Sequence, residues 1–364
     1  MASEMQCGVF HETYKSDMQV RPTTMQRARI VLAIVFALAL PFILGSVEMR
    51  IVNGVVIAAI GAIGLNILTG YTGQISLGQG AFLAVGAYAS GLSSVYFGFP
   101  WWLSIIFAAF VTAAFGMLIG IPSLRLKGLY LAVATLAAQQ IVQWVIINWD
   151  PIDGAIDGRT TDALNIPNAL LFGNPEWRLN NNEYAFYFLG LAVLALVVIA
   201  ATNLFRTHIG RAFVAIRDQD IAAQVMGVSL FRYKLLAFAL SSFIVGLAGG
   251  LMAQYSTAIS FERFTIEVSI EYLAMIIIGG LGTIGGSIYG AIFIVLLPEL
   301  LRLLGRAITG TDTDSIRAFN SLLPFLQQGV FGLAIVLALI FEPEGIQKLW
   351  RNIKDYFRLF PFRY

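Results

Sequence analysis

The sequence predicts an all-α polytopic membrane protein with about ten membrane-embedded helices. Of its 364 residues, 58% are hydrophobic and only 12% are charged, and the mean hydropathy of +0.78 is far above that of soluble globular proteins. The apolar residues occur in runs of about 20, the length that a helix needs to cross a bilayer. Charges lie between these runs, so they set orientation in the membrane, and we expect no nucleic-acid partner.

Several apolar runs and one longer stretch define the predicted elements. The stretch from Ser269 to Leu304 has GGLGTIGG at its middle and can form one long span or two shorter ones. Two crossings place more of the 23 Lys and Arg residues in the cytoplasm than one crossing does, and they leave both termini there. We therefore favour two crossings, with some segments glycine-broken or re-entrant. The other runs begin at Ile30, Ile51, Ile75, Trp101, Gly128, Tyr184, Leu235 and Leu322.

These segments divide the chain into a cytoplasmic amino-terminal tail (residues 1–29), a transmembrane domain (30–341) and a basic cytoplasmic tail (342–364). The domain contains an external loop at 150–183 and a polar cytoplasmic segment at 206–234. We expect the loop to be solvated, with a docking surface or an external gate as the alternative. For the run at Ile30, a cleaved signal peptide is the alternative to the uncleaved first helix that the long preceding tail favours.

Glycines interrupt two of the apolar stretches. Unwound backbone at membrane depth survives only where protein buries it or where it lines a cavity, so such breaks are typical of a substrate route. Close helix packing explains the same glycines without a transport role. A match to G-x-G-x-x-G at Gly280 carries no dinucleotide site, because membrane-length apolar sequence flanks it on both sides. The candidate hinge glycines, whose spacing hints at an internal repeat, are Gly70, Gly73 and Gly78, and Gly279, Gly282 and Gly285.

Polar side chains inside the apolar segments are candidates for lining a translocation path. Hydrogen bonding between helices explains each of them at least as well when it is taken alone. Glu271 shares a helix face with Glu267; it is a candidate for proton coupling if it is buried in the membrane, and a helix-start acid if it faces water. The candidate path residues are Asn66, Thr69, Gln74, Ser76, Gln79, Gln139, Gln143 and Glu271.

The chain contains little material for catalysis. Its single cysteine, Cys7, and its histidines, His11 and His208, lie outside the apolar segments, so we expect no metal site and no catalytic residue. The sequence contains no G-x-x-x-x-G-K-[ST], so we expect no cofactor on this chain and any ATP on partner subunits. An enzyme embedded in the membrane would need paired acids or histidines at one depth, and the sequence offers none.

The segment from His208 to Lys234 is amphipathic and lies on the predicted cytoplasmic side. A purely basic face would favour anionic lipid. The alternation of Arg and Asp in this segment instead favours a groove on a protein partner.

Five stretches of the sequence together indicate a protein family more specifically than any one of them does alone. They are GLNILTGYTGQISLGQGAFLAVGAYASG from Gly64, SLRLKGLYLAVATLA from Ser123, GRAFVAIRDQDIAAQVMGVSLFRYKLLAFALSS from Gly210, IIIGGLGTIGGSIYGA from Ile276 and FEPEGI from Phe341. Across about Ile51 to Ile346 the chain resembles the M-type permease subunits of bacterial ABC importers for branched-chain amino acids. The resemblance implies a multi-pass permease of the bacterial inner membrane. It also implies a sister permease, two cytoplasmic ATPase subunits, a periplasmic solute-binding protein and an amino-acid solute.

The resemblance also gives the polar segment the role of entering a groove on the ATPase. ABC importers often carry Glu-Ala-Ala followed by a spaced Gly; here Ile221 occupies the acidic position. The external loop, DPIDGAIDGRTTDALNIP, departs from the Thr-Gly-Gly element of the family. The implied coupling residues are Arg211, Arg217, Asp218, Asp220, Ala222, Ala223 and Gly227.

The expected function is therefore that of a permease subunit for branched-chain or related amino acids. Importers of urea or short amides share this architecture and remain alternatives. The alternative from another class of transporter is an ion-coupled secondary carrier with Glu271 at its coupling site. Such a carrier would work without partner subunits.

Overall fold

The computed structural model describes residues 24–123, 126, 128–148, 164–165, 182–256, 258–309, 325–326, 329–337, 340 and 345–348. The chain divides into two compact units, Met1–Met49 and Arg50–Tyr364. The described part of the first unit is helix α2 (Thr24–Ile43), which contains Pro41, and the start of α3 (Ser46–Asn66). Most of the predicted amino-terminal and carboxy-terminal tails lies outside the described residues.

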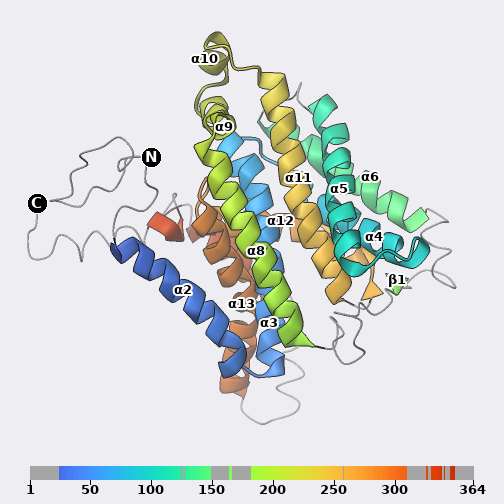
Figure 1. The fold of residues 1–364 in the computed structure, drawn as a ribbon, viewed down its shortest axis with the longest axis vertical. Coiled ribbons are helices and arrows are strands. Elements are labelled where there is room, and N and C mark those ends of the chain that lie inside the picture. Colours follow the sequence, from blue (N-terminus) through green and yellow to red (C-terminus); the bar gives the residue numbers. More distant parts are fainter. Residues whose placement is uncertain are drawn as a thin grey trace, which may run out of the picture. The chain divides into compact units, whose positions relative to one another are not determined.

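The second unit is built almost entirely of helices (Figure 1). Strands β1 and β2, of two residues each, pair antiparallel before η3, with Leu164 opposite Ile259. The elements after α3 are the π-helix η1 (Ile67–Tyr71), α4 (Gln79–Tyr96), α5 (Trp101–Ser123), α6 (Leu129–Asn148), β1 (Leu164–Asn165), α8 (Glu183–Arg206), α9 (His208–Asp218), α10 (Asp220–Val225), α11 (Leu230–Tyr255), β2 (Ala258–Ile259), the 3-10 helix η3 (Phe261–Phe264), α12 (Ile266–Gly279) and α13 (Ile284–Thr309).

Six helices of the described part are long and apolar enough to cross a membrane, so the predicted count of ten is not confirmed. Helix α4 has 18 residues but is not among the six, and α12 has only 14. Of the run predicted from Leu322, the structure describes residues 325–326, 329–337 and 340. The six spans are Ser46–Tyr71, Trp101–Pro122, Leu129–Asn148, Glu183–Arg206, Leu230–Tyr255 and Ile284–Leu303.

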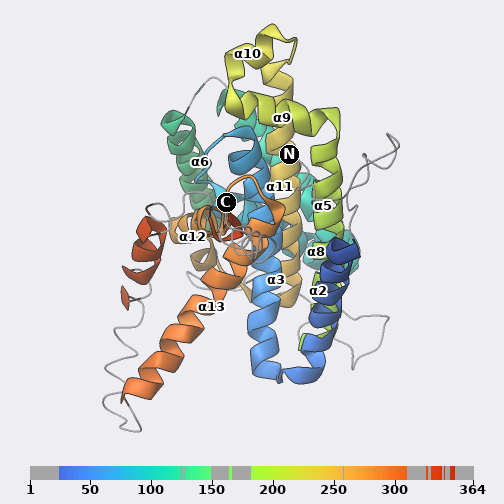
Figure 2. The same cartoon turned by 90° about the vertical axis from the view of Figure 1, so that its left-hand side faces the viewer.

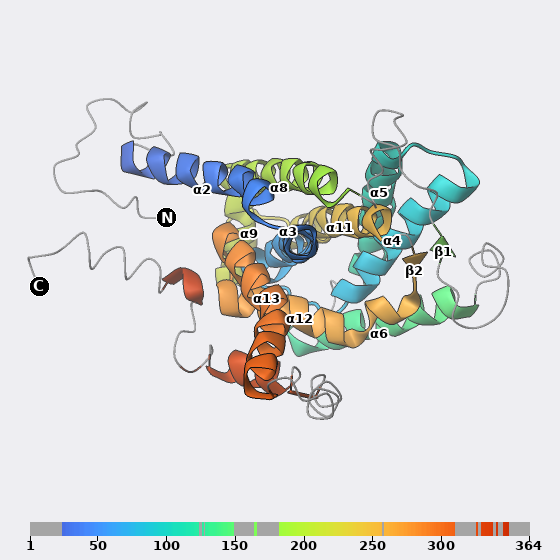
Figure 3. The same cartoon turned by 90° about the horizontal axis from the view of Figure 1, so that it is seen from below.

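Small residues let α11 pack closely against α4 and α5 (Figure 3). A Cβ atom placed on Gly86 of α4 would lie 2.8 Å from the Cα of Gly246 on α11, and one on Gly246 would lie 2.7 Å from Thr112 of α5. In a bilayer, where lipid is as apolar as the side chains, such backbone proximity provides the packing energy. These glycines therefore serve close helix packing.

Hydrogen bonds between helices satisfy the serines of α4. The amide of Gln254 on α11 donates to the hydroxyls of Ser90 and Ser94, at 3.0 and 3.1 Å. The hydroxyls of Ser94 and Ser104 lie 2.9 Å apart. All four residues are buried, so these bonds offset the cost of placing hydroxyl and amide groups away from water.

The stretch from Ser269 to Leu304 contains two helices with a break between them. Helix α12 ends at Gly279, and the backbone of Gly280 and Gly282 has positive φ, at 129° and 73°. Such angles suit glycine and interrupt an α-helix. A Cβ atom on Gly290 of α13 would overlap the carbonyl oxygen of Met275 on α12, so the two helices pack in close contact.

A polar cluster that the sequence did not indicate ties together α3, α8 and α11. Arg50 and Asn53 of α3 donate to the carboxylate of Glu183, at 3.2 and 3.0 Å, and the hydroxyl of Tyr255 donates to the same carboxylate. Asn182 caps α8 by accepting from the backbone N–H of Ala185. The first turn of α8 thereby joins the ends of two other helices.

Candidate functional site

Helices α9 and α10 form a short amphipathic unit at one end of α8 and α11 (Figure 2). In α9, Ala212, Phe213 and Ile216 are buried at helical spacing, whereas Arg211 and Asp218 are exposed. In α10, Ala223 is buried and Ala222 is exposed. The sequence predicted an amphipathic segment here, and the structure resolves it into two helices.

The tip of α10 exposes apolar side chains. Ile221, Val225 and Met226 are 70%, 82% and 84% exposed. Gly227, with φ of 87°, follows as a left-handed helix cap: its N–H donates to the carbonyl of Gln224, and the N–H of Val228 donates to that of Ala223. Gly227 therefore fixes the end of α10 and the direction in which the apolar tip projects.

Two arginines of α9 point to different surroundings. The Nη1 atom of Arg211 donates to the carbonyl of Arg206 within the same segment, at 3.3 Å. The Nη1 atom of Arg217 instead donates to the carbonyl of Gly70 in η1, at 2.7 Å. Arg217 thus joins the polar segment to the first helix break, a contact between residues 147 positions apart.

Side chains of the first break hold its backbone. The hydroxyl of Thr72 donates to the carbonyl of Leu68 at 2.5 Å, and the amide of Gln74 donates to Thr72 at 2.9 Å. The hydroxyl of Thr69 donates to the carbonyl of Gln74 at 3.1 Å. Gly73, with φ of 69°, makes the turn between them. Thr69 and Gln74, which the sequence offered as path residues, therefore form hydrogen bonds that stabilise this turn.

Asn66 connects the first break to the second. Its amide donates to the carbonyl of Thr283 and to the hydroxyl of Ser287, at 2.8 and 2.7 Å, and its oxygen accepts from the N–H of Gly282 at 2.9 Å. The side chain is buried. The two glycine-broken regions, more than 200 residues apart in sequence, thus meet at Asn66.

A second buried network joins the start of α4 to α6 and α12. Ser269 donates to the side-chain oxygen of Gln139 at 2.6 Å and accepts from the N–H of Gly80 at 2.8 Å. Gln139 also donates to the carbonyl of Phe264, at 3.3 Å. The sequence indicated Gln139 as a candidate but not Ser269, because a single hydroxyl group in an apolar stretch was the only sign of this site.

The remaining candidate path residues occupy different surroundings. Gln79 donates to the carbonyl of Gly61, and the hydroxyl of Ser76 accepts from the N–H of Gly78, both within buried structure. Gln143 lines a narrow crevice with Gln139, one turn away as predicted. Glu271 is half-buried in α12. The structure therefore does not bring all the predicted path residues together around one space.

Two of the other hinge glycines make close backbone contacts. A Cβ atom on Gly78 would lie 2.9 Å from the carbonyl oxygen of Thr135, and one on Gly279 would overlap the carbonyl oxygen of Gly286. A Cβ atom on Gly285 would lie 3.2 Å from the side-chain oxygen of Gln347, the end of a flexible side chain. Close approach of another backbone segment therefore accounts for Gly78 and Gly279 but not for Gly285.

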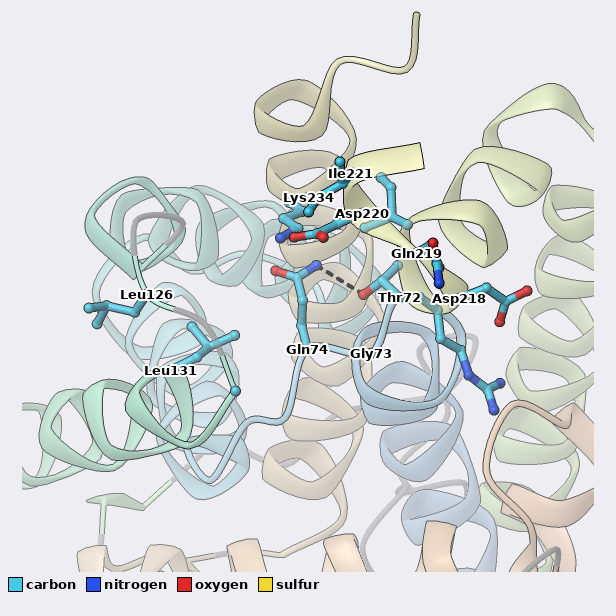
Figure 4. Close-up of a pocket in the computed structure, with 13 residues that line it drawn as sticks. Thr72, Gly73, Gln74, Leu126, Leu131, Asp218, Gln219, Asp220, Ile221 and Lys234 are labelled. Carbon is cyan, nitrogen blue, oxygen red and sulfur yellow. Dashed lines mark hydrogen bonds between the residues drawn. The ribbon is translucent and has the colours of Figure 1, made fainter. Parts of the chain in front are cut away.

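A cavity of about 450 Å³ lies between the polar segment, the turn at residues 72–74 and the start of α6. Figure 4 shows Gln74, Asp220 and Lys234 on one side of it and Leu126 and Leu131 on the other. The side-chain oxygen of Gln74 is buried, and no described residue donates a hydrogen bond to it. Arg217 and Asp218 also belong to the lining, so the cavity adjoins the contact between α9 and η1.

The chain matches the family described as "Branched-chain amino acid transport system / permease component" over residues 47–340. It is 32% identical to the high-affinity branched-chain amino acid transport system permease protein LivM of Salmonella typhimurium, over 90% of this chain and 76% of that protein. It is 27% identical to the probable branched-chain amino acid transport permease protein LivH of Methanocaldococcus jannaschii, over 80% of this chain and 89% of that protein.

A relative with a different printed substrate is the fructose import permease protein FrcC of Rhizobium meliloti, 28% identical over 70% of each chain. No solved structure matches the chain. The family match covers the helix breaks, the polar segment and the contacts between them, and it extends over most of the chain. The chain is therefore a multi-pass membrane permease and belongs to the family of permease components of branched-chain amino acid transport systems.

Proposed function

We propose that this chain is the permease subunit of an ATP-driven importer and provides part of the translocation path for branched-chain or related amino acids. The observation that carries the proposal is the α9–α10 unit, whose apolar tip at Ile221, Val225 and Met226 is exposed beside charged residues. An exposed apolar cluster rimmed by polar groups is typical of a protein-binding surface. The printed names of the relatives support the substrate class.

In this proposal the chain pairs with a sister permease and with two cytoplasmic ATPase subunits, which bind ATP. A periplasmic solute-binding protein delivers the amino acid. Both termini and the segment at 206–234 face the cytoplasm, and the loop at 150–183 faces the periplasm. Asp220 and Ala222 adjoin Ile221 in the chain. Arg211, Asp218 and Asp220 supply polar contacts at the rim of the ATPase groove, and Ala222 adds to its apolar part.

The decisive experiment measures uptake of labelled leucine into proteoliposomes at fixed ion gradients. Vesicles contain this chain with or without its ATPase, sister permease and binding protein, and with or without internal ATP. We expect uptake only with all components and ATP. Uptake by the chain alone, driven by an ion gradient, would overturn the proposal in favour of a secondary carrier. Half-buried Glu271 is then the residue to replace by Gln.

Competition sharpens the substrate class in the same vesicles. We expect excess unlabelled isoleucine or valine to reduce leucine uptake, and excess urea, acetamide or fructose to leave it unchanged. Uptake of urea, an amide or fructose in place of leucine would reject the proposed substrate and leave the ATP-driven permease intact.

Binding of the ATPase can be tested separately through the apolar tip. Met226→Asp places a charge at the exposed tip of α10 and should weaken association with the ATPase about tenfold or more, because an unpaired charge is then desolvated in the groove. Met226→Leu keeps an apolar side chain and serves as the matched control. Equal affinity of both variants for the ATPase, measured in detergent, would place the interface elsewhere.

A further inference from the structure

Three segments of the chain meet around the guanidinium group of Arg217. Its Nη1 atom donates to the carbonyl of Gly70 at 2.7 Å. A Cβ atom on Gly282 would lie 2.6 Å from the same Nη1 atom and 3.1 Å from the carbonyl oxygen of Gly70. The polar segment, the π-helix of the first break and the loop of the second break therefore share one contact point.

Glycine is required at both breaks for this contact to exist. A Cβ atom on Gly70 would overlap the side-chain oxygen of Asn66 and the backbone nitrogen of Gly282. At Gly282 the positive φ of 73° strains any residue that carries a Cβ atom, and a Cβ atom there would displace the Nη1 atom of Arg217. The N–H of Gly282 is held by Asn66 at 2.9 Å, so the loop cannot move away from η1 without breaking a buried hydrogen bond.

The backbone of α9 also lies directly on the first break. A Cβ atom on Gly73 would lie 3.5 Å from the Cα of Arg217, which is ordinary van der Waals contact. On the adjacent turn, the rings of Tyr71 and Phe205 are stacked. A displacement of α9 therefore acts on η1 both through packing and through a hydrogen bond from a charged donor, which is stronger than one between neutral groups.

We propose that Arg217 is a positioning residue that transmits movement of α9 to both helix breaks, and that Gly282 keeps open the space its guanidinium group occupies. The inference rests on the proposed function, because the ATPase is what would move α9. It differs from the role implied by the family resemblance, in which Arg217 contacts the ATPase. Although much of the Arg217 side chain is exposed, the donor atom is directed at the permease itself.

The test uses the complete complex in proteoliposomes and measures solute imported per ATP hydrolysed, together with the affinity of the ATPase. Arg217→Ala and Gly282→Ala should each lower the ratio about tenfold, within the range typical of coupling between sites, and leave the affinity unchanged. Arg217→Lys keeps a charged donor of different shape, so its ratio of solute imported to ATP hydrolysed should lie between those of Arg217→Ala and wild type. The double variant should have the same ratio as each single variant, because the two substitutions remove the same contact.

Two matched variants control for the effects of introducing Ala at a positive φ and of removing an exposed arginine. Gly98→Ala also introduces Ala at a positive φ, of 63°, but at a site where no atom in the described part of the chain lies within 4 Å of the new Cβ. Arg302→Ala removes an exposed arginine whose Nη1 pairs with Glu299 on its own helix. Both should keep the wild-type ratio.

The results separate failure of this inference from failure of the proposed function. If uptake by wild type needs no ATP, the proposed function fails first. If wild type needs ATP, a normal ratio in Arg217→Ala, additive losses in the double variant, or loss of ATPase affinity alone would each overturn the role assigned to Arg217. Should Arg217→Ala fail to assemble, Arg217→Lys and Gly282→Ala carry the same test.

Discussion

The two helix breaks are alike in sequence but are built in different ways. In the first, between Leu68 and Gly78, side-chain hydroxyl and amide groups bond to the backbone and replace the missing helical bonds. In the second, from Gly280 to Gly282, two positive φ angles, against one in the first break, and direct contact between the backbones of α12 and α13 predominate, with one hydroxyl bond to the backbone. Glycine spacing alone therefore does not distinguish a polar turn from a tightly packed one.

The largest effect should come from filling the backbone contact of the second break. In Gly290→Ala the new Cβ overlaps the carbonyl oxygen of Met275, so α12 and α13 must separate along a buried face. We expect a loss of more than about 4 kcal/mol of unfolding free energy and little assembled protein. Unfolding in mixed detergent measures the loss. Gly332→Ala, at a helical site with no atom of a described residue within 4 Å, is the control and should be neutral.

Removal of the link between the breaks should have the next largest effect. Asn66→Leu removes the hydrogen bonds to the N–H of Gly282 and to the hydroxyl of Ser287, which keeps only its bond to Thr283, and we expect a loss of about 3 kcal/mol of unfolding free energy. Ser287→Ala removes one bond of the three and should lose about 1 kcal/mol. Equal losses in the two variants would mean that the breaks are stabilised independently of Asn66.

A smaller effect is expected in the buried network at the start of α4, where the losses from replacing two glutamines on one face of α6 can be compared. Gln139→Leu removes bonds to Ser269 and Phe264 in a buried site and should lower the free energy of unfolding by about 2 kcal/mol. Gln143→Leu, at a half-buried position, should lose less than about 0.5 kcal/mol. If Gln143→Leu instead reduces uptake at normal stability, Gln143 lines the solute path.

The smallest effect is expected within the turn of the first break. Thr72→Val keeps the shape of the side chain but removes its hydrogen bonds to Leu68 and Gln74. We expect a loss of about 1 kcal/mol in unfolding free energy, because two bonds are lost and hydrogen bonds in a membrane protein contribute about 0.6 kcal/mol each on average. An unchanged melting temperature would show that Gly73 and the packing around it define the turn without Thr72.

The all-α class and the starts of three helices could be predicted because apolar run length determines them, whereas the runs from Ile30, Ile51 and Leu235 begin five or six residues inside the observed helices. The runs from Trp101, Gly128 and Tyr184 begin within one residue of the observed helices. The run from Ile75 does not, since α4 begins at Gln79. There the N–H of Leu77 donates to the hydroxyl of Thr135, 58 residues away, and that bond keeps the chain extended where its composition favours a helix.

The segments that form the candidate site could be predicted from the sequence, but the contacts between them could not. The amphipathic segment and the glycine breaks were visible from local patterns. The contacts of Asn66 with Thr283 and of Arg217 with Gly70 join residues 217 and 147 positions apart, and no periodicity in one segment encodes its distant partner. For the same reason the cluster around Glu183 was missed, because its donors lie on two other helices.

The serines of α4 have a consequence for how the chain is made. Helix α4 is not apolar enough to be counted among the membrane spans, and Gln254, which bonds Ser90 and Ser94, is synthesised some 160 residues later. We therefore expect α4 to settle into the bilayer only after α11 emerges from the ribosome. A nascent chain arrested before Leu230 should leave a cysteine placed in α4 open to water-soluble reagents, whereas the full-length chain should protect it. The order of synthesis thus becomes part of how a weakly apolar helix reaches the membrane.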